Sequence, residues 1–172
     1  MFVTLSKVEI NSLNDADLCW ACIEPAIHAY KQSKGIDFIE TYYKSLSKGQ
    51  QALFMYTVYF KHALNSKEEY YWWTAHLLMY RNAWPELKKS LLFFHAQAMI
   101  DHIERFISHL QLREMDGENP SLSILKNDFE LQSMVVSSFS TFQKLSHFTT
   151  RSISHYIRHH VSEFVQLKNE LN

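Results

Sequence analysis

Histidines are the residues of this sequence with the clearest chemical potential, because imidazole binds metal ions and titrates near neutral pH. The chain has ten histidines in 172 residues. His155 and His159 form an H-x-x-x-H motif. On a helix this spacing places two imidazoles on one face, where they can chelate a metal such as zinc.

Helical metalloproteins of the DinB type resemble this pattern, and the resemblance implies a third ligand from an earlier helix, for which His62 and His76 are the candidates. The helical wheel favours a different interpretation, in which His155 and His159 lie on a solvated face. We therefore predict no cofactor and keep the DinB-like metal site as an alternative. The opposite, apolar face of the expected helix contains Ile153, Ile157, His160, Val161, Phe164, Leu167 and Leu171.

A second group, His95, His102 and His109, repeats every seven residues. On one continuous helix these side chains would form a stripe along the edge of the apolar face. Their spacing along the axis is too large for one metal ion, so we interpret them as boundary residues beside a core. A protonation-sensitive interface is the alternative.

Aromatic residues are concentrated between Phe54 and Trp84, where ten of the 25 occur. They point in every direction on a helical wheel, which is typical of buried helices. We expect a central hairpin whose aromatic rings form the core. The alternative is an aromatic-lined ligand pocket, with these candidate residues: His62, Trp72, Trp73 and His76.

The C-terminal third contains a window without Asp or Glu, between Glu130 and Glu163. Residues 142–160 resemble a helix-turn-helix, although Gln143 and His147 occupy positions where that motif has a small residue and a glycine. The resemblance implies DNA binding as an alternative function, and a Ser-rich helix pair packed on the bundle is the simpler interpretation. The candidate nucleic-acid contacts are Lys144, Arg151, His155 and Arg158.

The two cysteines, Cys19 and Cys22, form a C-x-x-C sequence within a helical pattern. A redox motif of this form belongs to a βαβ context, and a structural zinc site needs two further ligands. We interpret both as buried, small apolar residues that form no disulfide with each other.

Only three Gly and three Pro are present, which excludes the many tight turns of a β-sandwich or barrel. We predict an all-α, single-domain bundle of six to eight helices covering residues 1–172, around a central hairpin from Gln50 to Tyr80. S-x-x-Q and S-x-x-E capping boxes begin the two helices of this hairpin, at Ser47 and Ser66.

The other helices follow from apolar periodicity, Pro and Gly. Residues 1–13 stay unassigned, and Pro25 either kinks the first helix or begins a new one. The expected segments are a helix over 15–31 ended by Gly35, a short helix over 37–46, a helix over 85–112 with a break near His95, a loop over 116–120, and helix over 122–171 with a break at 148–150.

A further resemblance, over residues 47–106, rests on Gly49 to Phe54, the run Glu69 to Trp73, Trp84-Pro85 and Phe93-Phe94. These segments resemble a group of small helical proteins from bacteria that have no assigned activity. The resemblance implies an all-helical, cytosolic bacterial protein.

No membrane span or secretory signal is recognisable, so we expect a cytoplasmic protein without membrane contact. The net charge of −1 points to no particular partner. No nucleophile and base, acid pair or ligand trio has the spacing that catalysis requires. We therefore predict a non-catalytic binding or interaction module with a protein partner, or a homodimer formed through surplus aromatic surface.

Overall fold

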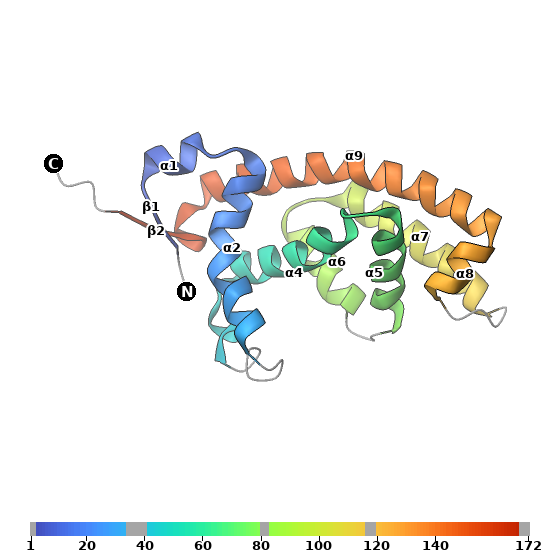
Figure 1. The fold of residues 1–172 in the computed structure, drawn as a ribbon. Coiled ribbons are helices and arrows are strands. Elements are labelled where there is room, and N and C mark those ends of the chain that lie inside the picture. Colours follow the sequence, from blue (N-terminus) through green and yellow to red (C-terminus); the bar gives the residue numbers. More distant parts are fainter. Residues whose placement is uncertain (1–2, 34–40, 80–82, 116–119, 169–172) are drawn as a thin grey trace. The chain divides into compact units, whose positions relative to one another are not determined.

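The computed structural model describes residues 3–33, 41–79, 83–115 and 120–168 (Figure 1). Within these ranges the chain is an all-α multi-helix bundle, as predicted, with eight α-helices and two three-residue strands. Short 3₁₀ turns cover Tyr43–Ser45 and Val161–Glu163. The helices are α1 Lys7–Ser12, α2 Asp15–Gln32, α4 Lys48–Ala63, α5 Lys67–Met79, α6 Ala83–Phe93, α7 Gln97–Met115, α8 Leu122–Asn127 and α9 Phe129–His159.

The chain divides into two units. The first contains Met1–Thr57 and Thr150–Asn172, and the second contains Val58–Thr149. Helices α4 and α9 each contribute residues to both units. The prediction of one domain requires that these two units unfold together.

Both predicted capping boxes begin helices. The Ser47 hydroxyl accepts a hydrogen bond from the Gln50 amide at 3.0 Å, and the Gln50 side chain accepts one from the Ser47 amide at 3.2 Å. At α5 the Ser66 hydroxyl accepts a hydrogen bond from the Glu69 amide at 3.1 Å. These side chains satisfy amides that have no partner inside the helix, which explains where α4 and α5 begin.

Helix α2 continues through Pro25, so the proline does not begin a new helix. Of the other predicted segments, Gly35, residues 37–40 of the short helix over 37–46 and residues 116–119 of the loop over 116–120 lie outside the described residues. The described rest of that short helix contains the 3₁₀ turn Tyr43–Ser45. In the first turn of α4, Gly49 lies against Phe164, because a Cβ atom at Gly49 would be 2.5 Å from Phe164 Cζ. A glycine is required here by the close approach of the Phe164 ring.

The predicted break near His95 is confirmed, and its cause is a left-handed residue. His95 has φ 57°, and the amides of His95 and Ala96 donate to the carbonyls of Leu92 and Leu91 at 3.0 and 2.9 Å. These two bonds define a Schellman motif that ends α6. His95, His102 and His109 therefore do not share one continuous helix.

Helix α9 corrects two predictions. It runs without a break from Phe129 to His159, so the break expected at 148–150 is wrong. The chain contains no Gly or Pro after Pro120, and nothing interrupts the backbone ladder. The helix expected up to residue 171 is also wrong: it ends at His159, and His160, predicted on the apolar face, is exposed.

The segment after α9 forms a strand instead. Val165–Leu167 (β2) pairs in parallel with Val3–Leu5 (β1), in the register Val3 to Val165. Both strands alternate apolar and polar residues, as V-T-L and V-Q-L, and this alternation was the local sign of a strand in the sequence.

The core of the second unit is aromatic, as predicted for the hairpin of α4 and α5. Tyr59, Phe60 and Tyr70 are at most 3% exposed. The Phe142 ring of α9 lies 5.1 Å from the Phe60 ring and 4.7 Å from the Tyr70 ring, measured between centroids. Such ring pairs add to the free energy gained by burying apolar area.

Candidate functional site

The four residues of the predicted ligand pocket lie at the end of α4 and on α5. The His62 ring stacks on the Trp73 ring with centroids 4.4 Å apart, and the His76 ring lies 5.5 Å from Trp73. His62 is half-exposed and its Nδ1 lies 3.8 Å from a carboxylate oxygen of Glu69. Three of the four candidates therefore come together as a partly exposed ring stack, and Trp72 on the same helix is 39% exposed.

A pocket of about 160 Å³ opens in a different part of the second unit. None of the four aromatic candidates lines it. Ligand sites for molecules of drug size usually have several hundred Å³, so this pocket is smaller than such a site. Its lining consists of Lys67, Glu68, Leu125, Lys126 and Gln132.

A buried polar cluster connects α5, α7 and α9. The Tyr70 hydroxyl lies 3.2 Å from His102 Nε2 and 2.8 Å from the Ser138 hydroxyl, and Ser138 lies 3.4 Å from the same ring nitrogen. Tyr70 and His102 are 0% and 6% exposed. The prediction that His102 is a boundary residue is wrong, because α5 and α9 cover this side of α7.

The environment of His102 opposes a charged imidazole. Burial, and to a smaller extent the nearby Arg105, lower the pKa of His102, while Ser138 acts in the other direction. Burial also raises the pKa of Tyr70, so its hydroxyl stays protonated. A neutral imidazole among aromatic rings fits a packing role, in which Nε2 of His102 shares one hydrogen bond between the hydroxyls of Tyr70 and Ser138.

This environment predicts acid destabilisation. Because the pKa of His102 is lower in the folded protein than the ordinary value near 6.5, the unfolded chain binds the proton more tightly. The contribution of neutral His102 to the free energy of unfolding is therefore complete above pH 6.5 and is lost as the pH falls through the pKa that His102 has in the folded protein. We expect His102→Gln to flatten the slope of unfolding free energy against pH between about 7.5 and 5, measured by urea denaturation.

The control for this experiment is His109→Gln, which changes an exposed histidine of the same helix. It should keep the slope of the parent protein. An unchanged slope in His102→Gln would show that His102 takes up its proton as easily in the folded as in the unfolded chain.

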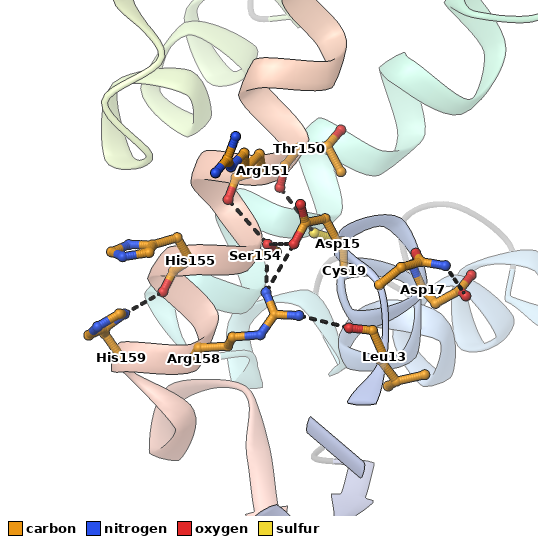
Figure 2. A network of polar contacts seen from close by, with 11 residues as sticks. Leu13, Asp15, Asp17, Cys19, Thr150, Arg151, Ser154, His155, Arg158 and His159 are labelled. Atoms are coloured by element: carbon orange, nitrogen blue, oxygen red, sulfur yellow. Dashed lines mark hydrogen bonds and ion pairs between the residues drawn. The ribbon is translucent and has the colours of Figure 1, made fainter. Parts of the chain in front are cut away.

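A second polar cluster lies in the first unit, where the C-terminal part of α9 meets the beginning of α2 (Figure 2). Arg158 donates hydrogen bonds to Asp15 at 3.0 Å, to Ser154 at 2.8 Å and to the Leu13 carbonyl at 2.8 Å. Ser154 also donates to Asp15. The Ser154 hydrogen bond and the Arg158 guanidinium lower the pKa of Asp15.

The helix-turn-helix prediction for residues 142–160 is wrong, because α9 is one continuous helix up to His159 and provides no turn. Of its four predicted nucleic-acid contacts, Lys144, Arg151 and His155 are exposed. Arg158 is instead bound to Asp15 and Leu13. Sequence reasoning missed the pairing of Arg158 with Asp15, because the two residues are 143 positions apart and no local pattern connects them.

His155 and His159 lie on the exposed side of α9, as the helical wheel predicted. Their ring centroids are 4.1 Å apart. Within the described ranges, no group of three or more His, Cys, Asp or Glu side chains is arranged to hold a metal ion. The DinB-like arrangement with a third protein ligand is therefore not formed by these residues.

Cys19 and Cys22 are free and buried, which confirms the interpretation as small apolar residues. Burial raises the pKa of both thiols to about 12. The Cys19 thiol donates to the Thr150 carbonyl with the sulfur 3.8 Å from the oxygen. Since the thiolate is the reactive form, these protonated thiols are poor nucleophiles.

The comparisons with known proteins add no class beyond the all-α fold. Family models, curated proteins and solved structures were compared with the chain, and none matches it. Across the part of the chain that the structure describes, no helix combines the length and the apolar composition needed to cross a bilayer.

Proposed function

We propose that this protein is a non-catalytic interaction module that associates with a second copy of itself through the exposed side of α9. The observation that carries the proposal is the charge pattern of this side over residues 130–148. Glu130 near one end and Lys144 near the other are its only acid and its only lysine or arginine. Exposed hydroxyl side chains, among them Ser133, Ser137 and Thr141, lie between them.

The spacing of these residues suits a two-fold pair. Glu130, Ser137 and Lys144 are seven residues apart, so they follow one line on the helix with a drift of about 20° at each step. Two antiparallel copies of α9 that cross at Ser137 would place Glu130 of each copy opposite Lys144 of the other. Homodimers usually have such two-fold symmetry, in which one surface pairs with itself.

Apolar side chains on the exposed part of α9 are a second reason to expect self-association. Phe129, Val136 and Phe148 are 82%, 46% and 68% exposed. Single exposed apolar residues are common, but two phenylalanines with most of their surface in water on one helix are a reason for association. Phe148 lies five full turns after Glu130 and therefore on the same line of the helix, whereas Phe129 and Val136 lie about 100° from that line. Burying the Phe148 ring in a pair would gain roughly 25 cal/mol for each Å² removed from water.

The reactive groups in the described residues support a non-catalytic role. The thiols are buried and protonated, and the Ser154 hydroxyl donates to Asp15 while it accepts from Arg158. In the cluster of Ser138 and His102, the Tyr70 hydroxyl binds both side chains. The thiols, Ser154 and the cluster of Tyr70, Ser138 and His102 are thus engaged in packing or in hydrogen bonds.

Charge reversal tests the pairing. In sedimentation velocity at low salt, the parent protein should show concentration-dependent association. Lys144→Glu and Glu130→Lys should each weaken it about tenfold, because two attractive contacts become repulsive. The double variant restores complementarity and should regain the parent affinity.

Lys61→Glu, a reversal on the exposed part of α4, serves as the matched control and should associate like the parent protein. A protein that stays monomeric at all concentrations would contradict the proposal. A double variant as weak as the single variants would contradict the antiparallel register through Ser137.

A further inference from the structure

The last two turns of α9 carry an exposed pair of imidazoles that the contacts inside the first unit do not use. Figure 2 shows His155 and His159 on one side of the helix, while Ser154 and Arg158 point to the other side, toward Asp15 and Leu13. The two rings have centroids 4.1 Å apart and an interplanar angle of 33°. Both side chains are exposed, so an ion can reach them from solvent.

The hydrogen bond of His159 orients its ring for metal binding. Its Nδ1 lies 2.8 Å from the His155 carbonyl oxygen. A carbonyl oxygen only accepts, so Nδ1 carries the proton and Nε2 keeps the lone pair. A backbone carbonyl that fixes the tautomer in this way is the usual outer partner of a metal-bound histidine.

Two arginines of α9 lie near the pair, and Arg151 is the one whose charge can repel a bound cation. Arg151 lies one turn before His155 and is exposed, whereas the charge of Arg158 is balanced by Asp15 at 3.0 Å. Helix α9 ends at His159, so the partial negative charge at the C-terminal end of its dipole lies beside the pair. A cation bound at this end of the helix interacts favourably with that charge.

We propose that His155 and His159 form a two-imidazole chelate for a divalent late transition metal ion, such as Zn²⁺, Ni²⁺ or Cu²⁺. The ligands are Nε2 of His159 and a ring nitrogen of His155. Water fills the remaining coordination positions, because no third protein ligand from the described residues reaches the pair. The site lies on the exposed side of α9 but beyond residues 130–148, the part proposed for self-association.

The test is a titration of untagged protein with Zn²⁺ and with Ni²⁺ by calorimetry at pH 7.5, at a concentration where sedimentation shows a monomer. One ion should bind to each chain. His155→Ala and His159→Ala should each lower the affinity about tenfold or more, because one imidazole no longer holds the ion close to the other. Lowering the pH should weaken binding, since protons compete with the metal ion for the same nitrogens.

Two histidines of α9 and its C-terminal end provide controls that leave the pair intact. His147→Ala and His160→Ala should bind as the parent protein does. Electron paramagnetic resonance of the Cu²⁺ complex gives a second measurement, with two coordinated imidazole nitrogens in the parent protein and one in His155→Ala. Equal affinity in all five proteins, or no binding by the parent protein, would overturn the proposal. Circular dichroism checks that the variants keep their helical content.

Discussion

Tyr70→Ala should lower the free energy of unfolding by about 3–5 kcal/mol, the usual range for removing a large aromatic ring from a core. The Tyr70 side chain is completely buried. Its ring stacks on Phe106 at 4.9 Å and on Phe142 at 4.7 Å, which belong to α7 and α9. Denaturation in urea, followed by circular dichroism, measures the change.

Tyr70→Phe separates the hydroxyl from the ring. It keeps the stacked ring but removes the hydrogen bonds to His102 and Ser138. We expect a loss of about 1–3 kcal/mol, because the imidazole is left with fewer partners in a buried place. Phe129→Ala, which removes a ring that is 82% exposed, is the control and should change stability little at low protein concentration. A Tyr70→Phe protein as stable as the parent would show that the polar cluster contributes nothing to stability.

Local signals predicted the helices well. The scarcity of Gly and Pro identified the fold class, and the boxes at Ser47 and Ser66 marked where α4 and α5 begin. These signals succeed because capping depends on residues three positions apart. The break at His95 was also predictable, although its left-handed conformation occurs at a residue other than glycine.

Predictions that depend on distant residues failed. The pairing of Val3 with Val165 joins the two ends of the described chain, and a helical wheel for residues 153–171 contains no information about that partner. Arg158 is a residue type that often contacts phosphate, but in this structure its guanidinium pairs with the Asp15 carboxylate. The charge of a side chain is visible in the sequence, whereas its partner is decided by packing.

Periodicity also did not predict how deeply a residue is buried. The heptad of His95, His102 and His109 correctly places His102 near the apolar face of its helix. Whether such a residue is exposed depends on the helices that cover it, which are α5 and α9. His62 and Trp73 are a second example. Their aromatic character suggested a ligand pocket as an alternative, whereas in the structure their rings stack on each other and the His62 side chain is half-exposed.

Phe164→Ala is the second substitution with a large expected effect, about 3–5 kcal/mol, and it acts in the first unit. Phe164 is completely buried just after α9. Its ring lies against Gly49 and meets the Tyr156 ring edge-on, with centroids 6.1 Å apart. Removing it leaves a cavity beside the first turn of α4. Phe148→Ala, at a ring that is 68% exposed, is the control.

Comparing Phe164→Ala with Tyr70→Ala tests the single-domain prediction, because the two residues belong to different units. Hydrogen exchange followed by mass spectrometry reports α2 in the first unit and α5 in the second. If the chain unfolds as one cooperative domain, each substitution should speed the slowest exchange in both helices by the same factor. Faster exchange in α2 alone for Phe164→Ala, and in α5 alone for Tyr70→Ala, would show two units that open independently. Continuous helices favour the first result, since α4 and α9 each contribute residues to both units and the i→i−4 hydrogen bonds that span the boundary are lost when either side unwinds there.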